Sequence, residues 1–188
     1  MIEDANMEQI SVMIEVAGPQ DAQIMAEIKF ENLMHRVKIG KLEMSKQEIE
    51  RARVTEESVH ALSEELTHSN DDDYYLAARS SGGVVGFCRM TWRPDSNRFQ
   101  FRQFYVQPKY LDRKIGGKIM AAAKERARHS EHAPMGMFLY TGDYNEEARQ
   151  RYEHWGFSNA GPEESKFEQR CDRKIEWIKM ILDFDESK

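Results

Sequence analysis

Residues 101–128 read FRQFYVQPKYLDRKIGGKIMAAAKERAR, and this stretch decides the fold. Residues 101–106 are mostly aromatic or β-branched, which favours a strand. Pro108 ends that strand, because a proline cannot donate a hydrogen bond to a sheet ladder. Beyond it, apolar residues recur at helical spacing at Ile115, Ile119, Met120, Ala123 and Ala127. The stretch therefore predicts a strand, a turn and a helix.

The turn between this strand and this helix, Arg113 to Lys118, combines basic side chains with the pair Gly116-Gly117. A turn of this kind directs backbone N–H groups and the positive end of the helix dipole toward one point, where phosphate is the usual anion. Strand–turn–helix units are also common without a ligand, and their glycines often serve only to form the turn. The turn by itself is therefore consistent with an anion site and with a purely structural connection.

Length and composition predict a single domain, residues 1–188, with a sizeable core. No apolar run approaches the ~20 residues of a membrane span, so we expect no membrane partner. The acidic start MIEDANMEQ lacks the basic-then-apolar order of a signal peptide. Cys88 and Cys171 lie far apart and do not indicate a disulfide framework. These features predict a cytoplasmic protein with reduced thiols.

Charge and histidine spacing narrow the classes of partner. The formal net charge of −6 disfavours nucleic-acid binding, which needs a basic face, and it tolerates a cationic small substrate. His129 and His132 are close, but they lie in a segment typical of a helix end and a loop. The six histidines form no metal motif, so we expect no metal.

Alternation and turn signals place the other elements. We expect strands near residues 10–16, 74–79, 84–92, 99–106, 135–141 and 174–182 with a short one from 157, and helices near 24–34, 55–66, 115–130 and 145–155. The charged segment 35–53 is consistent with a helix or an ordered loop, and Gly86 with a bulge or a close approach. The predicted fold is α/β (α+β), with a mixed, mostly antiparallel sheet of about seven strands flanked by helices.

Two segments carry residues at fixed spacing. The first contains Val106, Pro108, Tyr110, Ile115 and Gly116, and the second contains Asn145, Ala148, Tyr152, Gly156 and Phe157. They match V-x-P-x-Y-x-G-K-G-I-G in part and N-x-x-A-x-x-x-Y-x-x-x-G-F in full. With the order of elements, they resemble the GNAT family of N-acetyltransferases. Leu111 replaces the usual Gln or Arg, and Lys114 replaces a glycine and adds a charge that could meet a phosphate.

The resemblance implies a GNAT-like sheet and acetyl-CoA, or another acyl-CoA, as acyl donor. It implies that backbone groups of Phe104, Tyr105 and Val106 pair with the pantetheine arm. It implies that the pyrophosphate lies on the turn amides of Arg113, Lys114, Ile115, Gly116, Gly117 and Lys118. Asn145 would lie near the pantetheine, and Tyr152 matches the tyrosine that usually acts as general acid near the thioester sulfur.

Acyl transfer from a thioester to an amine needs a deprotonated nitrogen, a polarised carbonyl and a proton for the departing thiolate. The N–H of Val106 is well placed for the second requirement, and the phenol of Tyr152 can meet the third. Tyr152 could instead belong to the core, as an aromatic residue at helical spacing often does. We expect direct transfer in a ternary complex without a covalent acyl-enzyme, and we interpret Cys88 as a core residue.

The sequence identifies no general base. Many relatives carry a glutamate on the strand before the pyrophosphate turn, where this chain has Gln100, with Arg102 and Gln103 nearby. The run Asp71–Asp73 could act through water, although a solvated loop explains it as well. Glu31 and His35 are further candidates.

Three functions follow from these observations. The first is an N-acetyltransferase for a primary amine of a small molecule or peptide, with a cationic acceptor such as a polyamine or aminoglycoside slightly favoured. The second is a non-catalytic acyl-CoA sensor. The third is an unrelated nucleotide-binding protein, and the absence of a G-x-x-x-x-G-K-[ST] or G-x-G-x-x-G motif argues against it. We expect residues 27–53 and a loop at 161–171 to form the acceptor site, and the apolar last strand is consistent with a homodimer.

Overall fold

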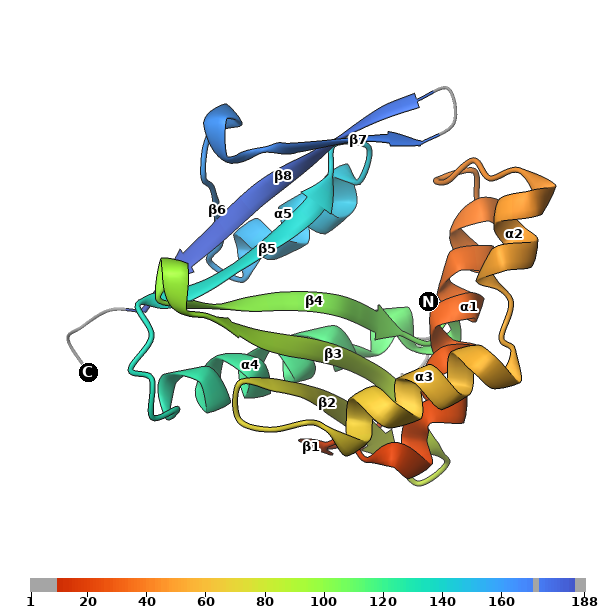
Figure 1. Ribbon diagram of the computed structural model, residues 1–188, viewed down its shortest axis with the longest axis horizontal. Coiled ribbons are helices and arrows are strands. Elements are labelled where there is room, and N and C mark those ends of the chain that lie inside the picture. Colours follow the sequence, from red (N-terminus) through yellow and green to blue (C-terminus); the bar gives the residue numbers. More distant parts are fainter. Residues whose placement is uncertain (1–9, 171–172, 185–188) are drawn as a thin grey trace, which may run out of the picture.

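The computed structural model describes residues 10–170 and 173–184, and in these residues eight strands form one mixed sheet (Figure 1). The strands are β1 (Met13–Val16), β2 (Asp73–Ser80), β3 (Gly83–Arg93), β4 (Arg98–Val106), β5 (Gly136–Gly142), β6 (Ser158–Asn159), β7 (Lys166–Arg170) and β8 (Arg173–Asp183). Their order is β1-β2-β3-β4-β5-β8-β6, with β7 also paired to β8. Only β4 and β5 pair in parallel among these strands.

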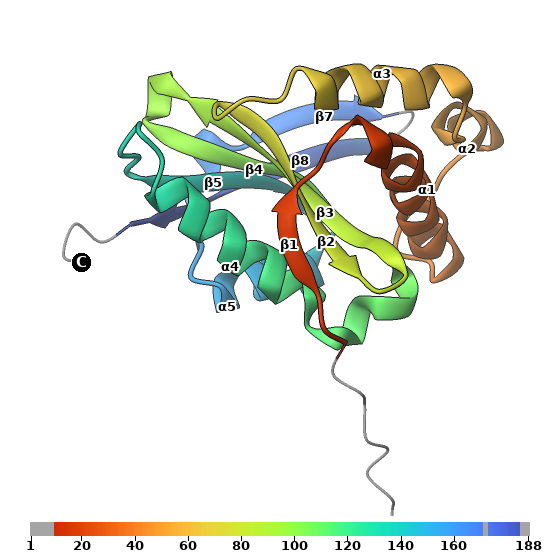
Figure 2. The ribbon, with the colours of Figure 1, turned by 90° about the horizontal axis from the view of Figure 1, so that it is seen from below.

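Helices cover both faces of the sheet (Figure 2). They are α1 (Ala22–Lys38), α2 (Lys46–Ala52), α3 (Glu56–Thr67), α4 (Ile115–Arg128) and α5 (Glu146–His154). Helices α1 and α3 lie on one face, and α4 and α5 lie on the other. Capping boxes at Ser45 and Thr55 begin α2 and α3, because each hydroxyl accepts from a backbone N–H that would otherwise lack a partner. No described helix is long and apolar enough to cross a bilayer.

The alternation of β2 divides the core into two clusters, one on each face of the sheet. Tyr74, Leu76 and Ala78 pack toward α4, whereas Tyr75 and Ala77 pack toward α1 and α3. Successive residues of a strand point to opposite faces, so one short segment contributes to both clusters. The predicted helical stripe of α4 is confirmed, since Ile115, Ile119, Met120, Ala123 and Ala127 are all buried.

The sheet opens between β4 and β5. These strands pair only where Arg98–Gln100 meet Gly136–Phe138, and then they diverge (Figure 1). Strand β4 continues beside β3 as far as Val106, and β5 continues beside β8 as far as Gly142. The divergence leaves a wedge between β4, which stays paired with β3, and β5, which stays paired with β8.

A bulge lies in β4 along this wedge. The register of β3 and β4 shifts between Phe87 and Arg89, and Gln103 adopts the left-handed conformation with φ 48°. The extra residue changes which side chains face which side of the sheet. Phe104 therefore packs with the α4 cluster, whereas Tyr105 packs with the α1–α3 cluster.

Several predictions need correction. The segment predicted as a loop at 161–171 contains the strand β7. Its sequence is charged and polar, and for that reason it did not indicate that the segment pairs with β8. Cys171 lies outside the described residues. Segment 35–53 contains α2, and the first strand covers only Met13–Val16. The predicted close approach at Gly86 is confirmed, because a Cβ there would lie 2.9 Å from the carbonyl oxygen of Tyr105.

Candidate active site

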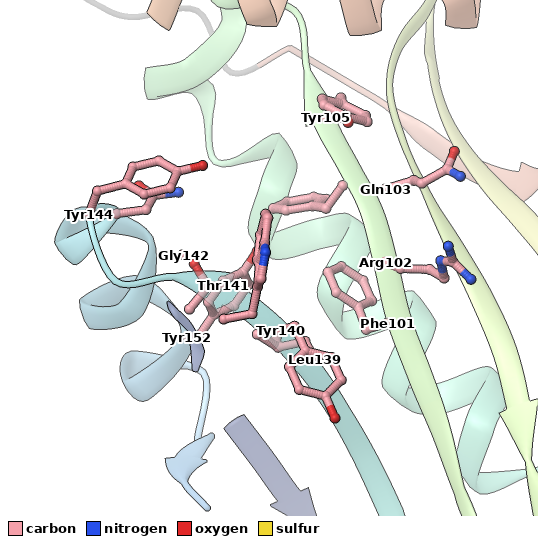
Figure 3. A pocket seen from close by; sticks show the side chains of 13 residues that line it. Phe101, Arg102, Gln103, Tyr105, Leu139, Tyr140, Thr141, Gly142, Tyr144 and Tyr152 are labelled. Carbon is pink, nitrogen blue, oxygen red and sulfur yellow. The ribbon is translucent and has the colours of Figure 1, made fainter. Parts of the chain in front are cut away.

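A cavity of about 190 Å³ occupies the wedge between β4 and β5 (Figure 3). Residues 101–105 of β4 form one wall, and residues 139–142 of β5 form another. Asn145 and Tyr152, at the beginning and in the last turn of α5, complete the lining together with Tyr144 and with Trp177 of β8. The structure therefore brings together three parts of the predicted site, namely Phe104 and Tyr105, Asn145, and Tyr152.

The edge of β4 along this cavity has backbone groups without a strand partner, because β5 leaves β4 after Gln100. The N–H of Gln107 donates to the carbonyl of Val85 at 2.9 Å, so Val106 must direct its own backbone groups away from β3. The carbonyl of Val106 accepts a hydrogen bond of 2.8 Å from Nδ2 of Asn32. The backbone contribution expected of Val106 is thus reduced to its N–H, because α1 already uses the carbonyl.

The turn before α4 is tight although it lacks the expected glycine. Lys114 takes the left-handed conformation itself, with φ 58° and ψ 14°, and α4 begins at Ile115. The first N–H groups of a helix have no acceptor within it, which leaves those of residues 115–117 to face outward. The N–H of Lys118 donates to the carbonyl of Lys114 at 3.3 Å, and its Nζ donates to the carbonyl of Ile10. Lys118 is therefore the weakest member of the predicted pyrophosphate set.

Gly116 has a packing role as well as a position at the helix start. A Cβ at Gly116 would lie 3.0 Å from Cζ of Phe104 and 3.5 Å from Cη2 of Trp155. The missing side chain lets the Phe104 ring, which borders the wedge cavity, lie against the first turn of α4. At Gly117 a Cβ would meet only Nε1 of Trp155, at 3.9 Å. The two adjacent glycines thus differ in how strictly the fold requires them.

Tyr152 combines the two roles that the sequence left open. Its ring packs edge-on against Trp155 and Phe157, with centroids 5.9 and 6.0 Å away, so it belongs to the core. It also lines the wedge cavity. Burial raises the pKa of the Tyr152 phenol to about 12. The phenol is therefore protonated at neutral pH, as a proton donor must be.

Asn145 and Tyr144 lie at the open end of the wedge. Asn145 is the N-cap residue of α5, as predicted, but its side chain makes no capping hydrogen bond. Tyr144 lies under the guanidinium of Arg36, which is 5.4 Å from the ring centroid. This contact joins α1 to the turn after β5, and the sequence did not indicate it because the two residues are far apart in the chain.

A second, larger cavity of about 480 Å³ lies on the other side of β4. It is bordered by α1, the end of α2, α3 and the strands β3 and β4. Gln103 and Tyr105, at the bulge, line both cavities. Figure 3 shows the Arg102 and Gln103 side chains on the side of β4 that faces away from Tyr144 and Tyr152. The bulge thus contributes to the walls of both cavities.

Comparison with known proteins decides the family. The model of the acetyltransferase (GNAT) family matches residues 41–157, more than half of the chain. The chain belongs to the GNAT family. It is accordingly an acyl-CoA-dependent acetyltransferase, as the two sequence motifs indicated. A search of curated proteins finds no match.

Solved structures agree on the fold of this GNAT protein. PaiA N-acetyltransferase from Thermoplasma acidophilum, in complex with coenzyme A, has a TM-score of 0.70 and 20% identity over 93% of this chain and 100% of its own. A GNAT acetyltransferase from Streptococcus pneumoniae has a TM-score of 0.65 and 20% identity over 93% and 100%. A chimera of the Vibrio cholerae spermidine N-acetyltransferase SpeG and hSSAT has a TM-score of 0.66 and 13% identity over 92% and 95%.

The acidic residues considered as bases in this acetyltransferase are engaged elsewhere. Asp71 pairs with Arg126 at 3.0 Å, and Asp72 lies 2.5 Å from Nε2 of His132. Two nitrogens of Arg89 donate to Asp73 at 2.7 and 2.6 Å. Burial opposes ionisation of Asp73, but the hydrogen bonds and charge of Arg89 outweigh it and lower the pKa of this carboxyl. None of these three aspartates lines either cavity, so none is placed to accept a proton from a ligand bound there.

Of the other residues considered in the search for a base, Arg102 lines the wedge cavity and Gln103 lines both cavities, but a guanidinium and an amide are not useful bases. Glu31, His35 and Gln100 line neither cavity, and Gln100 accepts hydrogen bonds of 3.0 and 2.9 Å from Arg93. The second cavity is instead lined by one carboxylate, Glu65. The sequence did not single out Glu65, because nothing local distinguishes it from the other glutamates of α3. Among the described residues, no three potential ligands gather to hold a metal.

Proposed function

We propose that this protein transfers an acetyl group from acetyl-CoA to a primary amine of a small molecule or peptide, by direct transfer in a ternary complex. The observation that carries the proposal is that Gln103 and Tyr105 line two cavities at once. One cavity is the wedge in the sheet, and the other lies beneath α1 and α3. A donor in the first and an acceptor in the second would approach each other at the bulge of β4.

The wedge suits the donor. The unpaired edge of β4 offers backbone groups to a ligand with amides of its own, such as the pantetheine arm. The first turn of α4, with the basic side chains of Arg113 and Lys114, suits the diphosphate of coenzyme A. The PaiA structure, which shares this fold, is a complex with coenzyme A. Together these features support acetyl-CoA as the donor.

Within this proposal the chemistry divides among a few groups. The N–H of Val106 hydrogen-bonds the thioester oxygen, which becomes more negative as the amine attacks. Tyr152 gives its proton to the departing thiolate of coenzyme A. The ammonium of the acceptor loses a proton to water near Glu65, a carboxylate that already accepts hydrogen bonds of 2.6 Å from Tyr75 and Arg89.

Direct transfer agrees with the state of Cys88. This cysteine is fully buried in the α4 cluster, and burial raises the pKa of its thiol. A buried, protonated thiol is a poor nucleophile, so Cys88 does not carry the acetyl group. Initial rates measured against both substrates test this point. Intersecting double-reciprocal lines are expected, and parallel lines would indicate a covalent acetyl-enzyme instead.

Release of free coenzyme A tests the activity itself. The purified protein is incubated with acetyl-CoA and single primary amines, and the new thiol is measured against a sample without amine. Amine-dependent release is expected, with acetylated amine detected by mass spectrometry. If acetyl-CoA bound in calorimetry but no amine released coenzyme A, the proposal of amine acetylation would be wrong.

The cellular setting and the assembly belong to the same proposal. We place the chain in the cytoplasm as one domain, and the free thiol of Cys88 is compatible with a reducing compartment. A homodimer is consistent with the exposed Phe167 on β7, which has a relative accessibility of 57%. Light scattering after size exclusion would measure the mass directly, and a mass of 22 kDa would exclude the dimer.

A further inference from the structure

The second cavity is basic although the whole chain is acidic. Four cationic side chains line it, at Lys29, Arg36, Arg51 and Arg53, against the single carboxylate of Glu65. Resting on the acetyl transfer proposed above, we infer that the acceptor carries an anionic group, such as a carboxylate, in addition to its amine. Guanidinium groups bind planar anions through paired hydrogen bonds, which makes a carboxylate a suitable ligand.

Most of this positive charge is not neutralised by the protein. Arg53 pairs with Glu50 at 3.0 Å on the exposed surface. In the described part of the chain, no carboxylate lies within 4.0 Å of a charged nitrogen of Lys29, Arg36 or Arg51. Glu65, in contrast, is already compensated by Arg89 at 2.6 Å. The net charge that faces the cavity is therefore positive, and Lys29, Arg36 and Arg51 are cations that no described carboxylate neutralises.

The charges are separated along the cavity. Arg51 and Arg53 lie at the N-terminal end of α3, which begins at Glu56, whereas Glu65 lies near its C-terminal end. Ser58 and Glu65 both line the cavity and are two helical turns apart, roughly 10 Å. The hydroxyl of Tyr75 joins Glu65 to Gln103, at 2.6 and 3.3 Å. The acidic end is thus the end that reaches the bulge of β4.

This arrangement orients a zwitterion. An ammonium drawn toward Glu65 and Gln103 comes to the bulge that borders both cavities, and an anionic group is held toward Arg51 and Arg53. Phe30, Leu33, Leu62 and Phe87 add apolar surface to the lining. The acceptor class is therefore an ω-amino acid, whose amine and carboxylate are separated by an apolar body long enough to reach from one end to the other. A polyamine would place a second ammonium beside the guanidinium groups.

Matched pairs of amines test the inference. The pairs are 6-aminohexanoate with hexylamine and 1,6-diaminohexane, and leucine with 3-methylbutylamine as the pair whose carboxylate is too close to the amine to reach Arg51. We expect kcat/KM for coenzyme A release to be at least about tenfold higher for 6-aminohexanoate than for hexylamine or 1,6-diaminohexane, since charged hydrogen bonds contribute about that much to binding. Equal or better rates with hexylamine or the diamine would overturn the inference while leaving amine acetylation intact.

Substitution of a cavity cation provides the second arm. Arg51→Gln and Arg53→Gln should reduce the preference for the acid over its neutral partner, measured as a ratio of kcat/KM. Lys46→Gln is the matched control, since Lys46 is an exposed residue of α2 that lies outside the cavity. A preference that Arg51→Gln and Arg53→Gln left unchanged would overturn the assignment to this cavity. If no amine released coenzyme A, the proposed function itself would fail, and this inference would fall with it.

Discussion

The side-chain amide of Asn32 on α1 donates a hydrogen bond of 2.8 Å to the carbonyl of Val106 at the end of β4. The same amide donates to the carbonyl of Ile28 at 2.9 Å, so it holds the helix that borders the acceptor cavity against the strand that borders both cavities. Asn32 is thus a structural link between the two candidate substrate sites.

Asn32→Ala should destabilise the protein by about 1–2 kcal/mol, because the buried carbonyl of Val106 loses its partner. The free energy of unfolding in urea measures the loss. We also expect KM for the acceptor to rise, since α1 is less firmly held. Gln23→Ala, at an exposed position of the same helix, is the control and should change stability by less than about 0.5 kcal/mol. Equal stability of the two variants would show that the Asn32 hydrogen bonds do not stabilise the protein.

Tyr152→Phe should lower kcat by about 100-fold and leave KM for acetyl-CoA nearly unchanged, since the phenol acts on the leaving thiolate rather than on binding. Steady-state kinetics measure both constants. Tyr110→Phe, outside both cavities, is the control. An unchanged kcat in Tyr152→Phe would remove this residue from the acid role.

The pH dependence of Tyr152 follows from the rise of its pKa to about 12, which burial causes. Because the folded pKa lies above the ordinary value of 10, the folded state holds this proton more tightly than the unfolded state. The associated stability is fully present below pH 10 and is lost as the pH rises toward 12. We therefore expect no loss of kcat from ionisation of Tyr152 below about pH 10. A pH–rate profile checks this expectation, and a fall near pH 8 that disappears in Tyr152→Phe would contradict it.

The two glycines of α4 should respond in opposite directions. Gly116→Val places a branched side chain against Phe104, and we expect a loss of about 1–3 kcal/mol in stability and a higher KM for acetyl-CoA. Gly117→Ala meets only an ordinary contact with Trp155, and the better helix propensity of alanine should stabilise the protein by up to about 1 kcal/mol. Thermal unfolding of both variants measures the contrast. Similar losses in both would mean that the turn, rather than Phe104, sets the requirement.

Lys114→Gly separates backbone strain from charge. A lysine in the left-handed conformation destabilises the folded state by roughly 1 kcal/mol. Glycine removes part of this strain, but its greater conformational freedom in the unfolded chain offsets the gain. Stability should therefore change little. If the ammonium meets a phosphate, KM for acetyl-CoA should rise several-fold and depend less on salt. The measurement is KM for acetyl-CoA at two ionic strengths. Identical KM values for the native protein and Lys114→Gly would show that Lys114 does not belong to the donor site.

The amino-acid sequence by itself determined the elements that depend on near neighbours. Proline ends β4, periodic apolar residues define α4, and the spacing from Asn145 to Phe157 defines α5 and the turn that follows it. The resemblance of two motifs to the GNAT family implied that Phe104, Tyr105, Asn145 and Tyr152 belong to one site, and the wedge cavity brings these four together. Local spacing sufficed for the elements themselves, because helices and turns are stabilised by contacts within a few residues.

Only the tertiary structure decided where strands part and where charges gather. The divergence of β4 from β5 depends on the other neighbours of each strand, and β7 exists because β8 offers it an edge. The positive charge of the second cavity comes from side chains of α1, of α2 and of Arg53 that are separated in the chain, within a protein of net charge −6. Net charge is a sum over all residues, whereas a ligand meets only those that folding places within a few ångströms of it.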